Sequence, residues 1–230
     1  MEMRYQKDFQ FQHPFAMTII GSRRTGKTNF VKNLLISRDK HFNSEIDDIY
    51  WFSPGYNEVF DELEENIPNI KLIKGLPSNI SALLSDKSRK TLFVIDDLIS
   101  QAGKRVDVSD MFTNGRHSNL SVILLTQNMY HKGRHFRDMS INSDYFVIFK
   151  NIRDTTSLRH LGMQMNNLEF LTEVFDDIAE KPFSHVVIDF RADTPKHLRF
   201  RSNIFGENGE HPILYKNINQ NNKKMKYSDK

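Results

Sequence analysis

The feature that most constrains this chain is a glycine-rich segment between an apolar run and a helix pattern. Residues 21–28 read Gly-Ser-Arg-Arg-Thr-Gly-Lys-Thr, which fits the pattern G-x-x-x-x-G-K-[ST]. The apolar run Phe15–Ile20 precedes the segment, and apolar residues recur at helical spacing after it: Phe30, Val31, Leu34 and Leu35. A strand, this loop and a helix, in that order, are the context in which the pattern binds phosphate. The sequence therefore predicts a phosphate-binding loop.

The residue types in the loop suit an anion site. Gly21 and Gly26 permit backbone angles at which amide N–H groups converge on phosphate oxygens, and the following helix directs its positive end to the same place. Lys27 is expected to bridge the β- and γ-phosphates of ATP, and the Thr28 hydroxyl to bind Mg²⁺. The other residues of the loop complete the predicted ATP site: Ser22, Arg23, Arg24 and Thr25. The two arginines occupy variable positions and are expected to face solvent or a neighbour.

Short apolar runs recur along the chain and predict an α/β fold. Most are almost continuously apolar, as expected for parallel strands that are covered on both faces. Helix patterns lie between them, including one that contains Leu168, Phe170, Leu171, Val174 and Phe175. We expect a mostly parallel central sheet with helices on both faces and a ligand at the carboxyl ends of the strands. The predicted strands are Phe15–Ile20, Asp48–Phe52, Lys71–Ile73, Thr91–Ile95, Leu120–Thr126, Asp144–Phe149, His185–Phe190 and Leu198–Arg201.

The composition sets the domain organisation and the broad class. With 230 residues and 38% hydrophobic content, the chain suits one domain, predicted over 1–205. Residues 206–230 are polar and basic and predict a flexible tail. The net charge of +3 neither demands nor excludes nucleic acid. The chain has no cysteine and its longest apolar runs are strand-sized, which predicts a soluble intracellular protein without a membrane partner.

Two adjacent carboxylates follow a buried-strand pattern. The run Thr91–Ile95 leads into Asp96 and Asp97. Either charge would be costly inside the sheet, so both are expected at the strand's end, beside the nucleotide. We expect Asp96 to hold Mg²⁺ and Asp97 to polarise the attacking water. The second position of such a pair is more often Glu, which weakens the assignment of Asp97 relative to that of Asp96.

A neutral amide ends the next strand pattern. The run Leu120–Thr126 follows a polar turn with the sequence Gly-Arg-His-Ser-Asn and ends at Gln127. An amide at that point would donate to a γ-phosphate oxygen or hold the attacking water. Gln127 is therefore the expected γ-phosphate sensor.

These motifs, in this order, resemble the FtsK–HerA superfamily of P-loop DNA translocases. The resemblance covers about residues 15–160 and is strongest over 91–128, where Val-Ile-Asp-Asp is followed by Gly-Arg-His and Leu-Leu-Thr-Gln. Within the superfamily, the short chain and the Asp-Asp pair look like the genome-packaging ATPases of double-jelly-roll DNA viruses, including virophages and Polinton-like elements.

The resemblance implies properties that the residues alone do not show. It implies a RecA-like core of the ASCE type, with the glutamine strand between the two nucleotide-binding strands. It also implies a homo-oligomeric ring, pentameric or hexameric, that hydrolyses Mg–ATP to pump double-stranded DNA into a capsid. Such a motor would contact capsid proteins and act inside the host cell, in a virus factory, the cytoplasm or the nucleus, or in association with the virion.

Arginines and basic loops supply the remaining candidates. Ring ATPases complete each site with an arginine from the adjacent subunit; Arg116 matches the family's Gly-Arg before the glutamine strand, and Arg153 and Arg159 are the alternatives. Two segments would suit a DNA backbone: Lys104 with Arg105, and Lys132, Arg134, His135 and Arg137 with Tyr130 and Phe136 interleaved. His131 and His135 have the spacing of a helical metal pair, but Gly133 interrupts it, and we do not expect a zinc site.

Two other classes of function stay open at this point. A P-loop phosphotransferase would need an acceptor pocket and an arginine-bearing lid, and the sequence has no compact segment of that kind. A nucleotide-gated interaction protein would bind ATP without useful turnover, and the Asp at position 97 keeps this reading open. Stimulation of ATP hydrolysis by duplex DNA would separate the motor from both.

Overall fold

The structure is a computed structural model that describes residues 1–5, 9–129, 134–150, 155–179, 181–206 and 212–217. Contacts divide the chain into two compact units, each of which we describe by itself. Unit 2 comprises residues 10–147, and unit 1 comprises the described residues of 1–9 and 148–230. Strand β7 (Tyr145–Phe149) contains the boundary between them. The segment expected to form one domain, 1–205, is thus divided between the two units.

Unit 2 is built on a sheet with the strand order β7-β2-β6-β5-β3-β4. Parallel pairings join β2 to β6, β6 to β5, β5 to β3 and β3 to β4. All side chains of β2, β5 and β6 are buried, which explains why these strands are almost continuously apolar. The expected parallel sheet is confirmed in this unit. The strands span Ala16–Ile20 (β2), Asp48–Ser53 (β3), Ile70–Lys74 (β4), Thr91–Asp96 (β5) and Leu120–Thr126 (β6).

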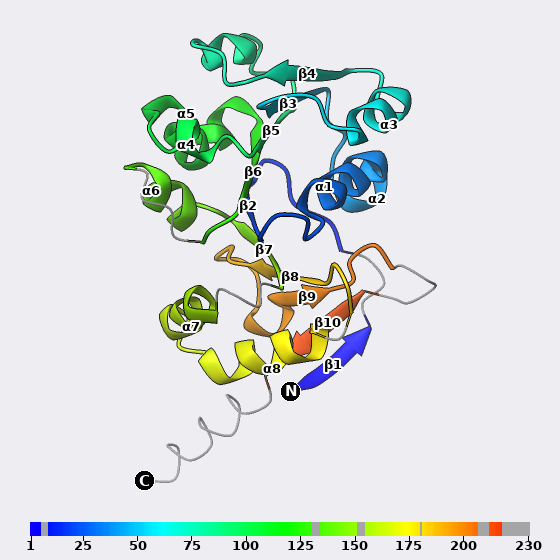
Figure 1. The fold of residues 1–230 in the computed structure, drawn as a ribbon, viewed down its shortest axis with the longest axis vertical. Helices are drawn as coiled ribbons and strands as arrows, with labels where there is room; N and C mark the ends of the chain where they lie inside the picture. Colours follow the sequence, from blue (N-terminus) through cyan, green and yellow to red (C-terminus); the bar gives the residue numbers. More distant parts are fainter. Residues whose placement is uncertain (6–8, 130–133, 151–154, 180, 207–211, 218–230) are drawn as a thin grey trace. The chain divides into compact units, whose positions relative to one another are not determined.

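Helices cover both faces of the unit 2 sheet (Figure 1). One face carries α1 (Lys27–Ile36), α2 (Arg38–His41) and α3 (Val59–Asn66). The other carries α4 (Ile99–Ala102), α5 (Val106–Asn114) and α6 (Phe136–Ile141). Helix α1 buries the four residues that its spacing predicts. Short 3-10 helices span Ile80–Leu84 (η1) and Gly115–Ser118 (η2).

Unit 1 combines an antiparallel sheet with two helices. The strand order is β1-β10-β9-β8, and each of these pairings is antiparallel. Helices α7 and α8 meet closely, because a Cβ atom at Gly162 would lie 2.8 Å from the Leu168 Cα. The elements span Glu2–Tyr5 (β1), Thr155–Gln164 (α7), Leu168–Ile178 (α8), His185–Asp189 (β8), Lys196–Leu198 (η3), Phe200–Ser202 (β9) and Ile213–Lys216 (β10).

Unit 1 departs from the sequence-based expectation in two ways. Strands β8 and β9 exist as predicted but pair antiparallel, because the connection between them, residues 190–199, is shorter than the dozen or more residues that a parallel crossover needs. Strand β10 lies inside the segment predicted to be a flexible tail. It is ordered because Leu214 and Tyr215 are buried and the Tyr215 hydroxyl donates to Asp177 Oδ2 at 2.6 Å. Among the residues that the structure describes, every helix falls short of the length and apolarity needed to cross a membrane.

Candidate nucleotide site

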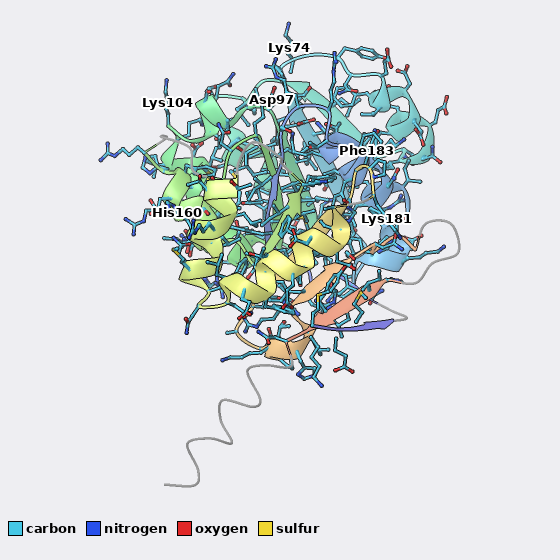
Figure 2. The ribbon with its side chains drawn as sticks, turned by 60° about the horizontal axis from the view of Figure 1, so that its bottom comes forward. Lys74, Asp97, Lys104, His160, Lys181 and Phe183 are labelled. Atoms are coloured by element: carbon cyan, nitrogen blue, oxygen red, sulfur yellow. The ribbon has the colours of Figure 1, made fainter. Side chains whose placement is uncertain are left out.

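The predicted site residues follow three neighbouring strands of unit 2. Strand β6 lies between β2 and β5, with Thr126 in register with Ile20, and Leu125 in register with Asp96. The glutamine strand is therefore central, as the resemblance implies. Because the three strands are parallel, the phosphate loop, the acid pair and Gln127 leave the sheet at the same edge. Figure 2 shows Asp97 toward this edge of unit 2, together with Lys74 at the end of β4.

The predicted phosphate loop, residues 21–28, leads from β2 into the first turn of α1. The Gly21 N–H donates to the Thr126 carbonyl at 3.2 Å, and the Thr25 hydroxyl donates to the Ser22 carbonyl at 2.9 Å. Gly26 has φ 100, in the left-handed region that favours glycine. Among the described residues, no side chain caps the start of α1 and its first turn holds no acid. A helix start of this kind is suited to bind an anion through its backbone amides.

Lys27 occupies the centre of the loop. Its ammonium donates to the carbonyls of Gly21 at 2.6 Å and Ser22 at 2.8 Å. Burial lowers the pKa of Lys27, while the nearby charges of Asp96 and Asp97 favour its protonated form. A half-buried ammonium whose hydrogen bonds in the described structure go to neutral carbonyls would gain by exchanging them for charged phosphate oxygens.

A hydrogen bond joins Thr28, at the end of the loop, to Asp96, at the end of β5. The Thr28 hydroxyl donates to Asp96 Oδ2 at 3.3 Å. Burial raises the pKa of the Asp96 carboxyl to about 6, and the charge of Asp97 adds to this rise. A buried carboxylate with this excess of negative charge fits a divalent cation.

The donor set suits Mg²⁺. The described residues contain no group of three or more His, Cys, Asp or Glu side chains that could hold a metal. Mg²⁺ needs no such cage, because it keeps several waters and binds one or two protein ligands plus substrate phosphates. The Thr28 hydroxyl and the Asp96 carboxylate are therefore sufficient as protein ligands.

Asp97 and Gln127 form the other half of the site. The side-chain N–H of Gln127 donates to Asp97 Oδ1 at 2.9 Å. Asp97 has φ 53, a conformation in which Asp and Asn are enriched because a short polar side chain tolerates it. This backbone offers a physical reason for Asp where related ATPases more often carry Glu.

Arg116 lies at the opposite edge of the sheet from the phosphate loop of its own chain. It is exposed on η2, just before β6 begins, and the seven residues of β6 separate it from Gln127 by about 20 Å. The turn is tight, because a Cβ at Gly115 would lie 3.1 Å from the Leu120 carbonyl oxygen. Of the other two arginine candidates, Arg159 is exposed on α7 of unit 1, and Arg153 lies outside the described residues.

The two basic segments adjoin each other in unit 2. The His135 N–H donates to the Gly103 carbonyl at 3.1 Å, so the start of α6 lies against the loop between α4 and α5. Lys104, Arg134 and Arg137 are exposed, and we call these three the basic patch; Lys104 is labelled in Figure 2.

Other members of the basic segments do not belong to this patch. Arg105 is engaged by Asp107 and by the carbonyl of Pro77 at 2.6 Å. Phe136 was expected between the basic residues as a candidate for DNA contact, but it is only 2% exposed and packs in the core. The described residues do not include Tyr130, Lys132 or His131, the histidine that has the spacing of a metal pair with His135.

Trp51 is a residue of this site that the sequence alone does not single out. It lies on β3, fully buried, and its indole N–H favours the charged form of Asp96. The hydrogen bond from Thr28 and the charge of Lys27 act in the same direction. No spacing in the sequence signals this contact, because Trp51 is distant from Asp96 along the chain and becomes its neighbour only through the pairing of β3 with β5.

Comparison with known proteins places the chain among viral proteins. The family model described as Poxvirus A32 protein matches residues 2–165. The DNA packaging protein OPG160 of Vaccinia virus (strain Copenhagen) is 27% identical over 153 residues, which cover 56% of this chain and 52% of the relative. The protein of the same name from Monkeypox virus is 27% identical over 153 residues, 56% of this chain and 47% of its own. The chain thus spans about half the length of the curated relatives it matches.

Solved structures share the fold. The genome packaging NTPase B204 from Sulfolobus turreted icosahedral virus 2, in complex with ATP-gammaS, matches with a TM-score of 0.54 and 17% identity, over 82% of this chain and 96% of that chain. The cytoplasmic domain of the Thermomonospora curvata Type VII secretion ATPase EccC matches with a TM-score of 0.53 and 11% identity, over 78% and 24%. The predicted α/β, RecA-like P-loop fold is confirmed, and the family match confirms the recognition drawn from the sequence.

Proposed function

We propose that this chain, which belongs to the Poxvirus A32 protein family, hydrolyses Mg–ATP to drive double-stranded DNA into a viral capsid. The ATPase part rests on one observation: Lys27, the Thr28–Asp96 pair and the Asp97–Gln127 pair converge at the carboxyl ends of β2, β5 and β6. The DNA part is supported by the curated relatives, which are named DNA packaging proteins, and by the basic patch. A homo-oligomeric ring that contacts capsid proteins inside the infected host cell completes the proposal.

The loop residues would bind the triphosphate. Lys27 would exchange its two carbonyl partners for β- and γ-phosphate oxygens, while the loop amides and the start of α1 hold the remaining oxygens. Thr28 and Asp96 would hold Mg²⁺, which neutralises charge on the phosphates when bound. Arg23 and Arg24 would contribute through their backbone.

The second pair, Asp97 and Gln127, would act on the attacking water. In the proposed step the water oxygen bonds to the γ-phosphorus, the bond to the β–γ bridging oxygen breaks, and Asp97 accepts the water proton. Gln127 would orient that water or the γ-phosphate through its amide. Their mutual hydrogen bond keeps both side chains within reach of one small molecule.

Asparagine substitutions are expected to separate the two acids. Asp97→Asn should retain Mg–ATP binding and lose about a hundredfold or more in turnover, because the amide keeps the shape and tolerates the positive φ but cannot accept a proton. Asp96→Asn should instead weaken metal-dependent nucleotide binding. Binding of a fluorescent ATP analogue with and without Mg²⁺, measured beside steady-state hydrolysis, checks both; the opposite pattern would invert the two roles.

Duplex DNA is expected to stimulate hydrolysis, and the basic patch to mediate that stimulation. ATP turnover should rise on addition of linear duplex DNA, and the rise should weaken with salt because it depends on phosphate contacts. The double variant Lys104→Glu, Arg137→Glu should lose most of the DNA-dependent increment. Lys40→Glu is the matched control, since Lys40 is exposed on α2, across the sheet from the patch (Figure 1).

The outcomes also separate the alternative functions. Hydrolysis that duplex DNA leaves unchanged, in rings verified by particle sizing, would contradict the translocase proposal and favour a phosphotransferase or a nucleotide-gated protein. An equal loss of stimulation in Lys40→Glu would remove the patch as the specific contact and leave general charge as the cause.

A further inference from the structure

Trp51 is placed to act on the Asp96 carboxylate from the neighbouring strand. Its in-register partner on β5 is Val94, two residues before Asp96. Side chains alternate along a strand, so Val94 and Asp96 point to the same face of the sheet as Trp51. The indole packs edge-on against Phe60 of α3 at 5.7 Å between ring centroids, which fixes the ring on the face that α1 also covers.

The indole N–H has no other use in the described structure. Trp51 is 0% exposed, and its Nε1 atom makes no hydrogen bond of ordinary length and angle within the described residues. Buried indole N–H groups normally find an acceptor, because leaving one unpaired is costly. The strand register brings the Asp96 carboxylate to the same face as the indole; the Oδ2 of this carboxylate receives the Thr28 hydroxyl, and the indole N–H favours its charged form.

We propose that Trp51 is a positioning residue whose indole N–H orients the Asp96 carboxylate toward Thr28 and a bound divalent cation. This inference rests on the proposed function. The carboxylate receives the Thr28 hydroxyl from α1 and faces the indole of β3, so its orientation is set from two elements. A carboxylate whose orientation is already fixed binds the cation more tightly, because less conformational freedom of the side chain is lost on binding.

The test is the metal dependence of Trp51→Phe, which removes the N–H and keeps an aromatic ring. We expect the Mg²⁺ concentration for half-maximal hydrolysis to rise about tenfold, with a smaller change in kcat at saturating Mg²⁺. Binding of Mn²⁺ in the presence of ADP, followed by electron paramagnetic resonance, should weaken in parallel. Phe60→Leu is the matched control, because it loosens the packing of the same indole and keeps the N–H. Wild-type metal dependence in Trp51→Phe, or an equal rise in Phe60→Leu, would overturn the proposal.

A second measurement needs no variant, because the chain contains a single tryptophan. In the wild type, Mg–ADP should change the emission of Trp51 more than ADP alone does. Nucleotide binding without any metal-dependent emission change would contradict the role of Trp51 and leave the proposed function standing. A wild-type chain that binds no nucleotide, measured by calorimetry, would reject the proposed function itself, so the two failures are distinguishable.

Discussion

Lys27→Ala is expected to reduce ATP turnover by at least about a hundredfold, to the background of the assay. The substitution removes the cation that lies between the loop carbonyls of Gly21 and Ser22, where the β- and γ-phosphates are expected. It also leaves Asp96 and Asp97 without the positive charge beside them, so triphosphate binding should weaken as well. Release of phosphate from ATP and binding of a fluorescent nucleotide measure the two effects.

The fold of this variant should persist, because Lys27 is the first residue of α1 and the buried stripe of that helix begins at Phe30. Lys32→Ala is the matched control: it removes a lysine from the same helix, one that pairs with Glu62 at 2.6 Å and does not face the loop. Near-wild-type turnover in Lys32→Ala, with similar thermal unfolding of both variants, would assign the loss to the phosphate site. Wild-type-like turnover in Lys27→Ala would end the ATPase assignment.

The sequence predicts unit 2 well, because its signals there are local. A fully buried parallel strand is a short apolar run, and Leu120–Thr126 is predicted with the bounds that the structure shows. The phosphate loop is equally local, since one eight-residue pattern contains the turn, the cation and the hydroxyl. The carboxyl ends of parallel strands lie at the same edge of the sheet, which predicts that Asp96 and Gln127 lie near the loop. The structure places them there.

The sequence fails where a residue's environment comes from distant segments. Strand β10 lies among polar residues, which predict a flexible tail, but its partners are β1, at the other end of the chain, and β9. Phe136 lies among basic residues, which makes it a candidate for DNA contact in the sequence, but as the first residue of α6 it packs into the core. The role of Trp51 depends on the pairing of β3 with β5, which no spacing records. Asp97 departs from the usual Glu, and its positive φ becomes visible only in the backbone.

Arg116→Ala is expected to bind ATP normally and to hydrolyse it about a thousandfold more slowly or worse, because an arginine supplied in trans stabilises charge on the transferring phosphoryl group. Two observations support a role at a neighbour's site. Arg116 is exposed on η2, and the length of β6 keeps it away from its own phosphate loop. Steady-state turnover and nucleotide affinity, compared with those of Arg159→Ala, measure the effect.

Mixed rings supply the sharper test of the trans role. Arg116→Ala subunits have intact phosphate loops, and Lys27→Ala subunits have defective loops but keep the arginine. When the two are assembled together, each interface that joins an intact loop to an intact arginine should become active, so part of the lost turnover should return. Mass measurement of the rings verifies that both subunits are present. Mixed rings without recovery would contradict the trans role. Full activity of Arg116→Ala alone would remove this arginine from the site, and an effect found in Arg159→Ala would transfer the role to α7.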